Sequence, residues 1–287
     1  MRMSHGMSTL EGSIPVSTAP WPTNALRRLI DRTETIRFLV SSNLKAGHRD
    51  KLLGQLWSLL DPALFIGVYF LVFGVLFGQS SRARPTEFLL YLVIGVIAWR
   101  FTDTTISQAA GCIRANRGLI HGANFPKSVF PVSLCCARLY DYAWGLVVLF
   151  IVMLIAGVSI TAHMLWLPLI VLVQTAFVLG CAFLVAYLGA FFADTVHLVS
   201  VGLRLWFYGS PILYYATGDK GLIPEQHLVW YMLNPVACLL ESYRSVLLYG
   251  QAPNSFWLMY AALFAIAVLI GGFALFSRAE GEFAKHV

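Results

Sequence analysis

The feature that most constrains this chain is the recurrence of apolar stretches long enough to cross a lipid bilayer. A helix needs about 20 mostly apolar residues to span the roughly 30 Å hydrocarbon layer. Six such stretches follow one another, and 58% of all residues are hydrophobic while only 12% are charged. A soluble domain carries about 25% charged residues. The composition therefore predicts a protein whose solvent is lipid, and it excludes a soluble globule, a disordered chain and a nucleic-acid binder.

The predicted fold is all-α and integral to the membrane. The second half of the second stretch, from Arg100 to Gln108, is polar, so it is expected to face protein or a wet cavity rather than lipid. We expect a disordered tail over residues 1–24, a cytoplasmic amphipathic or interfacial segment over 25–58, and a six-span domain over 59–287. The six spans are expected at residues 59–77, 88–108, 139–158, 165–192, 196–215 and 256–276.

Lysine and arginine residues outside these spans are divided unevenly between alternate loops. Thirteen lie on the side that holds both termini, and four lie on the other side. Loops rich in Lys and Arg stay in the cytoplasm during insertion. The sequence therefore predicts a multi-pass protein with both termini in the cytoplasm.

An amphipathic segment precedes the first span. Apolar residues recur at helical spacing from Leu26 to Val40, and mostly basic residues occupy the opposite face. This pattern favours a helix lying on an anionic inner leaflet, although a helix packed on a partner subunit has the same pattern. Four basic residues of the inner rim are expected to attract anionic headgroups: Arg28, Arg32, Lys45 and Arg49.

The segment between the fifth and sixth spans is too apolar for a solvated loop. Residues 227–233 and 236–249 are each too short to cross the bilayer, and Asn234-Pro235 separates them. They predict a re-entrant helical hairpin over residues 227–249, and a helix pair lying on the outer surface is the alternative. Glu241 and Arg244, three residues apart, are expected to pair.

Aromatic residues make up 14% of the chain, and many gather near the outer ends of the spans. They are consistent with the interfacial belt of membrane proteins. They are also consistent with a sugar path, because the apolar face of a pyranose ring packs on aromatic rings, and composition does not separate the two interpretations. The candidate channel and gate aromatics are Trp206, Tyr208, Tyr214, Tyr215, Trp230 and Tyr231.

No reactive constellation is recognisable in the sequence. The chain has no GxxxxGK[ST] phosphate loop, no HExxH spacing and no GxSxG elbow. The five cysteines lack CxxC spacing, so neither a metal site nor a disulfide framework is expected. Asp103 and Asp141 would suit a proton-coupled carrier, but pairing with Arg100 and Arg138 explains them better. We therefore expect no catalytic residues and no cofactor in this chain.

Several segments occur in an order that resembles one family. Residues 52–62 (LLGQLWSLLDP) and 71–78 (LVFGVLFG) are similar to the opening of the permease subunits of type-two ATP-binding-cassette (ABC) exporters. These subunits move lipid-linked O-antigen, capsule and teichoic-acid polymers. Further similar segments are Asn116–Ile120, Asn124–Lys127 with Pro131, Ser210–Tyr214, Asn234-Pro235, Tyr243-Arg244 and the closing Glu282-Phe283-Ala284.

The resemblance implies a homodimer in the bacterial inner membrane with the pore at the dimer interface. Each copy would dock on a separate nucleotide-binding ATPase subunit that binds ATP and Mg, and the cargo would be a lipid-linked polysaccharide. The hairpin with Asn234, Pro235, Glu241 and Arg244 would form a re-entrant gate. The segment from about Cys112 to Asn124 would be the coupling helix, with Arg114, Asn116, Arg117, Leu119 and Asn124 as coupling residues.

The sequence leaves two other functions open. One is an exporter of a drug or small lipid from the same superfamily. The other is a different class, a membrane glycosyltransferase or a proton-coupled carrier, which the missing reactive constellation disfavours.

Overall fold

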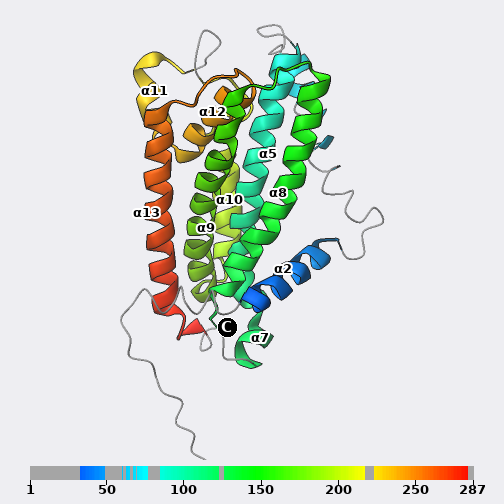
Figure 1. The fold of residues 1–287 in the computed structure, drawn as a ribbon. Helices are drawn as coiled ribbons and strands as arrows, with labels where there is room; N and C mark the ends of the chain where they lie inside the picture. The colour runs from blue at the N-terminus through cyan, green and yellow to red at the C-terminus, as the bar shows by residue number, and fades with distance from the viewer. Residues whose placement is uncertain are drawn as a thin grey trace, which may run out of the picture.

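The computed structural model describes residues 33–48, 60, 63–64, 67–68, 70–76, 85–122, 126–216 and 223–283, and every regular element in these ranges is a helix. Long helices stand side by side in a bundle (Figure 1). The predicted tail over residues 1–24 lies outside the described residues. The predicted first span, residues 59–77, is described in pieces, of which the π-helical segment η2 (Phe70–Leu76) is the longest.

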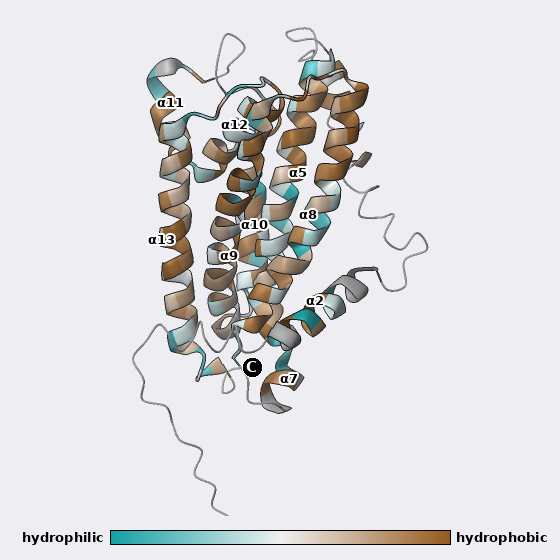
Figure 2. Cartoon of the chain, viewed as in Figure 1, coloured by the Kyte–Doolittle hydropathy of each residue, from teal (hydrophilic) through white to brown (hydrophobic). Residues whose placement is uncertain are grey.

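Four of the described helices are long and apolar enough to cross a membrane. In Figure 2 they are coloured as hydrophobic over most of their length. The prediction of an all-helical membrane chain is therefore confirmed. The four helices are α5 (Pro85–Ala109), α8 (Val129–Ile155), α9 (Leu167–Phe191), which continues the short 3-10 helix η3 (Ala162–Trp166), and α13 (Ser255–Ala279).

Helix α8 begins well before the predicted third span. Its first turns bury Val129, Phe130 and Leu134 against neighbouring helices. This part of the sequence mixes polar and apolar residues, so hydropathy alone did not mark it as helical. The helix therefore extends beyond the purely apolar stretch at its N-terminal end, which lies at the same end of the bundle as the last turn of α13 (Figure 1).

Helix α10 (Thr195–Tyr208) is shorter than the predicted fifth span, residues 196–215. Its 14 residues at 1.5 Å each extend about 21 Å, which is less than the roughly 30 Å hydrocarbon layer. The chain turns after Tyr208 and is not helical up to Ala216. Pro211 explains the early end, because proline lacks the N–H that a helix needs and disfavours helical geometry in the preceding residue.

A break at Asn234 separates α11 (Glu225–Met232) from α12 (Pro235–Leu247), as the sequence indicates. The Asn234 side chain caps α12 by accepting a hydrogen bond from the Val236 backbone N–H at 3.1 Å. Pro235 occupies the first helical turn, where a missing N–H costs nothing. Two residue types with strong positional preferences thus fix this helix start. Helix α12 is buried along most of its length.

The two ends of the bundle are built from different segments. We call the base the end formed by residues 110–122, 126–129, 189–195 and 276–283, which includes α6 (Cys112–Ala115) and α7 (Arg117–Gly122). We call the crown the end formed by residues 209–216 and 223–234. Figure 1 shows α11 at the crown and the last turn of α13 at the base.

Helix α2 (Thr33–His48) lies across the long helices near the base (Figure 1). Leu39 is buried against the base, while Phe38 is 69% exposed. Asn43 Nδ2 donates to Ser133 Oγ of α8 at 3.5 Å. One face of the helix therefore packs on the bundle and the other is open. Of the four predicted inner-rim residues, Arg28, Arg32 and Arg49 lie outside the described residues, and so does the side chain of Lys45.

Helices α9 and α13 approach closely because glycines face each other. A Cβ atom built on Gly180 would lie 2.6 Å from the Leu269 backbone nitrogen, and one built on Gly272 would overlap the Gly180 carbonyl oxygen. By contrast, a Cβ atom built on Gly271 meets nothing within 4 Å. Small residues at this contact allow the two backbones to pack directly.

We predict that Gly272→Ala lowers the free energy of unfolding by about 1–3 kcal/mol, because an added methyl group in a filled contact forces the helices apart. Gly271→Ala, the matched control one residue away, should leave stability unchanged or slightly higher. Thermal unfolding of the two purified variants in detergent measures the difference. Equal melting temperatures would contradict the assigned contact.

Candidate functional site

A polar hollow of about 540 Å³ lies between α5 and α10. Its apolar wall includes Trp99 and Phe207. Its polar side chains come from both helices. Within each helix they are spaced by about one or two helical turns, so they lie on the same face. They are Arg100, Asp103, Thr104 and Ser107 of α5 and Ser200, Arg204 and Tyr208 of α10.

This hollow collects the polar half of the second predicted span. Arg100 and Asp103 are three residues apart and share one face of α5, where opposite charges attract each other. Thr104 Oγ1 donates to the Arg100 carbonyl at 2.6 Å, which is the usual way for a helix to satisfy a threonine. Charged groups at bilayer depth are costly unless they face protein or water. The hollow provides that environment.

A buried amide supports the back of the hollow. Gln174 of α9 is 3% exposed, and its Nε2 donates to the Ala98 carbonyl at 2.8 Å and to Thr102 Oγ1 at 3.1 Å. Its Oε1 accepts from Tyr243 OH at 2.7 Å. These bonds join α5, α9 and α12. The sequence analysis missed Gln174, although a single amide within the apolar run 167–191 is a usable signal.

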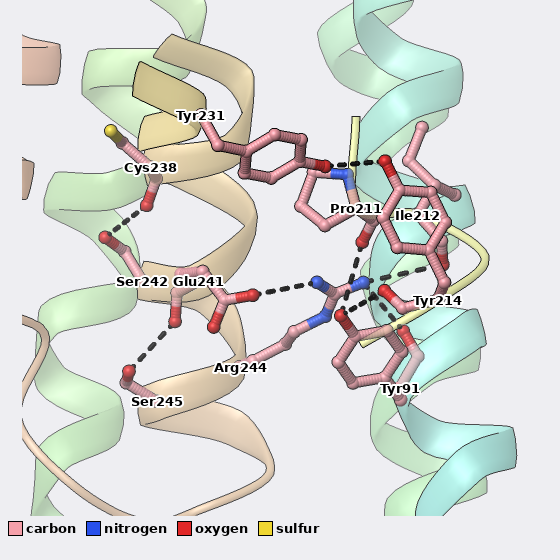
Figure 3. A network of polar contacts seen from close by, with 10 residues as sticks. All are labelled: Tyr91, Pro211, Ile212, Tyr214, Tyr231, Cys238, Glu241, Ser242, Arg244 and Ser245. Carbon is pink, nitrogen blue, oxygen red and sulfur yellow. Dashed lines mark hydrogen bonds and ion pairs between the residues drawn. The ribbon is translucent and has the colours of Figure 1, made fainter. Parts of the chain in front are cut away.

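The predicted pair of Glu241 and Arg244 is present, but its surroundings are not those of a loop. The two side chains are 3.3 Å apart, and Arg244 is completely buried between α12 and α5. Its guanidinium carbon lies 3.3 Å from the ring centroid of Tyr91 (Figure 3), a cation–π contact. Its Nη2 is 3.5 Å from the carbonyl oxygens of Tyr91 and Ile212. Arg244 therefore joins α12, α5 and the turn that follows α10.

Hydrogen bonds connect this arginine to the crown. Tyr91 OH donates to the Tyr214 carbonyl at 2.7 Å, and the Tyr214 and Tyr231 hydroxyls are 2.8 Å apart (Figure 3). Sequence analysis did not single out Tyr91, because its partners are more than a hundred residues away. The turn after α10 and helix α11 are thus held to α5 through tyrosines.

Asn234 adds a second connection at the crown. Its Oδ1 accepts from Trp206 Nε1 at 3.0 Å, and its Nδ2 donates to Ser210 Oγ at 3.0 Å. One amide therefore caps α12 and also binds the end of α10. The end of α10, the following turn and the α11–α12 pair form one hydrogen-bonded unit.

The six candidate aromatics occupy different environments. Trp206, Tyr214 and Tyr231 lie within the crown network, and Tyr208, 60% exposed, lines the hollow. Tyr215 is buried, with its ring 4.2 Å from that of Tyr91, so it packs inside the chain and does not face the hollow. Trp230 is exposed on α11.

The predicted coupling residues also separate into groups. Arg117 and Leu119 are exposed on α7. Arg114 instead bonds within the chain, donating from Nε to the Gly189 carbonyl at 2.7 Å and from Nη2 to the Ala190 carbonyl at 3.3 Å, where it caps α9. Asn116 Nδ2 donates to the Cys112 carbonyl at 2.8 Å. Asn124 lies outside the described residues.

The second carboxylate that the sequence singles out, Asp141, lies on α8. Asp141 pairs with Arg138 at 2.6 Å, as predicted. Among the residues that the structure describes, no three His, Cys, Asp or Glu side chains gather closely enough to hold a metal ion.

Comparison with known proteins identifies the class. Residues 34–248 match the model of the ABC-2 type transporter family, and the chain belongs to this family. It is 28% identical to the O-antigen export system permease protein RfbA of Myxococcus xanthus over 249 residues, which cover 87% of this chain and 94% of that protein. The RfbA protein of Klebsiella pneumoniae is 25% identical over 86% of this chain and 92% of its own length. The polysialic acid transport protein KpsM of Escherichia coli is 24% identical over 79% of this chain and 86% of its own length. The resemblance inferred from the sequence motifs is therefore confirmed.

We predict that Arg244→Met destabilises the protein by about 3–5 kcal/mol, because it removes one partner of a buried ion pair. Arg204→Met, which removes an exposed arginine of the hollow, should change stability by about 0.5 kcal/mol or less. The melting temperatures of both purified variants test this difference. Similar values for both would show that Arg244 does not join the three elements.

Proposed function

We propose that this chain is the membrane permease of an ATP-driven exporter that carries a lipid-linked polysaccharide outward across the inner membrane. The observation that carries the proposal is the hollow between α5 and α10, which gathers two arginines, a carboxylate and four hydroxyl side chains beside Trp99 and Phe207, along a helix long enough to cross a membrane. The functions for which the relatives are named, O-antigen export and polysialic acid transport, support a polysaccharide over a drug or small lipid.

The lining of the hollow suits a sugar polymer. Pyranose rings present apolar faces that pack on aromatic side chains, and hydroxyl groups that exchange hydrogen bonds with Ser, Thr and Tyr. Tyr208 and Ser107 can exchange such hydrogen bonds with a sugar polymer as it moves through the hollow. Many weak contacts of this kind hold a moving polymer without trapping it, because no single site binds it tightly.

A second copy of the chain is proposed to close the path. Helix α10 exposes Leu198, Val201, Leu205 and Tyr208 at helical spacing beside the polar hollow. An exposed charged hollow cannot face lipid without a large cost. Two protomers that meet along this face would enclose a wet path between them, which supports a homodimer with the pore at its interface.

The distribution of charge supports a cytoplasmic base. Arg114, Arg117, Lys127 and Arg278 lie at or near the base, and Arg37 is exposed on the adjacent α2. Loops rich in these residues remain in the cytoplasm. With the base inside, α2 would lie on the inner leaflet, and α7 would face a separate nucleotide-binding ATPase. Such a subunit is needed as an energy source because the chain has no phosphate loop.

The crown would then form the outward gate. Helices α11 and α12 are each too short to cross the bilayer, and Val229, Trp230 and Leu233 on α11 and its end are exposed and apolar. This supports a re-entrant hairpin that enters the outer leaflet. Its bonds to Trp206 and Tyr214 would allow the hairpin to move together with the end of α10 when the gate opens.

We predict that the purified chain exports labelled lipid-linked polysaccharide across proteoliposome membranes only with a separate ATPase subunit and ATP. Ser107→Trp, which fills the hollow, should reduce export at least about tenfold, since a path blocked by a large side chain cannot pass a polymer. Leu263→Trp, on the exposed face of α13, is the matched control and should retain export. Uphill transport by the chain alone, or equal export by both variants, would refute the proposal.

A further inference from the structure

Two of the segments that carry the family resemblance include Lys127 and Glu282-Phe283, and these described residues belong neither to the hollow nor to the crown. They are separated by more than 150 residues in the sequence, yet the structure brings Lys127 and the residues just after α13 together at the base. We call residues 280–283 the C-terminal brace.

The brace begins with two hydrogen bonds that Lys127 donates to Glu280, one from its backbone and one from its side chain. The Lys127 backbone N–H donates to the Glu280 carboxylate. The Lys127 ammonium donates to the Glu280 backbone carbonyl at 3.0 Å. The chain also turns back on itself, since the Glu282 N–H donates to the Ala279 carbonyl at 2.9 Å. The end of α13 is therefore fastened to the start of α8.

Phe283 anchors the brace in an aromatic cluster. Its side chain is fully buried, and its ring centroid lies 5.0 Å from that of Phe276 and 5.8 Å from that of Phe191. The same apolar cluster contains Ile113 of α6 and Ile120 of α7. The Phe283 side chain thus packs on α9 and α13, within an apolar cluster that also includes residues of the proposed coupling segment.

The coupling segment is also fastened at its other end. Arg114 donates to carbonyls at the end of α9, and Gly189 lies so close to Ala110 that any Cβ atom would overlap the Ala110 carbonyl oxygen. Between the attachments at Arg114 and Lys127, Arg117 and Leu119 of α7 are exposed. A displacement of α7 would therefore pull on α9 through Arg114 and on the end of α13 through Lys127.

We infer that the C-terminal brace positions the coupling segment, so that α7 is presented to the ATPase in a fixed orientation and its motion reaches α9 and α13. Glu280 and Phe283 are positioning residues in this scheme, since they act through the coupling segment and not on the cargo. The inference rests on the proposed function, because it assigns α7 as the docking point of an ATPase.

The first test compares two shortened chains in proteoliposomes that contain the ATPase subunit. A chain that ends at Phe283 keeps the brace and should assemble, hydrolyse ATP and export as the full chain does. A chain that ends at Ala279 lacks the brace, and its export per ATP hydrolysed should fall at least about tenfold while ATP hydrolysis continues. Equal export per ATP in both chains would overturn the inference.

The second test needs no transport and uses the full-length chain. Glu280→Ala removes the acceptor of the Lys127 N–H, so hydrogen–deuterium exchange in the peptide containing Lys127 should rise at least about tenfold. Glu282→Ala changes an exposed carboxylate and is the matched control, which should leave that peptide unchanged. Peptides from the middle of α9 should be protected equally in both variants, which shows that the bundle is intact.

The outcomes separate the two levels of the proposal. If the full-length chain with its ATPase exports nothing, the proposed function fails, whereas the exchange result still decides whether the brace holds Lys127. If the full-length chain exports and the chain that ends at Ala279 does not assemble, export per ATP hydrolysed is measured for the full-length Glu280→Ala variant instead. Unchanged export per ATP or unchanged exchange in Glu280→Ala would overturn the brace.

Discussion

The arrangement of this protein depends on the cost of placing polar groups at bilayer depth. Helices α9 and α13 avoid that cost over most of their length. Their side chains there are apolar, and their backbone N–H and C=O groups are hydrogen-bonded within each helix. Helix α5 does not avoid it, since Arg100 and Asp103 lie on a helix long enough to cross a membrane. The short α10 meets α5 along these residues and leaves a hollow between them. A permease path along the hollow avoids the cost of exposing these polar residues to lipid, because they would then face water and polar cargo.

Buried polar links hold the wall of this hollow in place from behind. Gln174 joins α9 to α5 and α12, and Arg244 joins α12 to Tyr91 and to the turn after α10. A buried ion pair contributes little net stability compared with an apolar replacement, but breaking one partner is costly. We interpret Arg244 as a residue that fixes how the crown sits on α5. At the base, Arg114 and the C-terminal brace do the same for α7, so both ends of the proposed path are attached to the long helices.

Sequence patterns predicted the elements better than their connections. Apolar length is a local property, and it located α5, α9 and α13, while Asn234-Pro235 marked the start of α12 because both residues have strong positional preferences. The pairing of Glu241 with Arg244 was also local. The early end of α10 was missed although Pro211 signals it, because hydropathy outweighed the helix-breaking residue.

What the sequence patterns did not predict are contacts between residues that are distant along the chain. Nothing near Arg244 indicates Tyr91, nothing near Arg114 indicates the end of α9, and Tyr215 reads as an exposed interfacial ring until Tyr91 is placed beside it. Such contacts are set by tertiary packing, which residue type and spacing do not encode.

The most direct test of the account is whether the α5–α10 face is wet within an intact membrane. Single cysteines at Ser107 and Ser200 in the hollow, and at Leu263 and Ile270 on the exposed face of α13, would be introduced into a chain whose five native cysteines are replaced. A small, membrane-impermeant maleimide, supplied to both sides of the membrane, reports water at each position. The account predicts rapid labelling at positions 107 and 200 and almost none at 263 and 270. Equal protection at all four positions would show that the hollow is dry, and would contradict a path along this face.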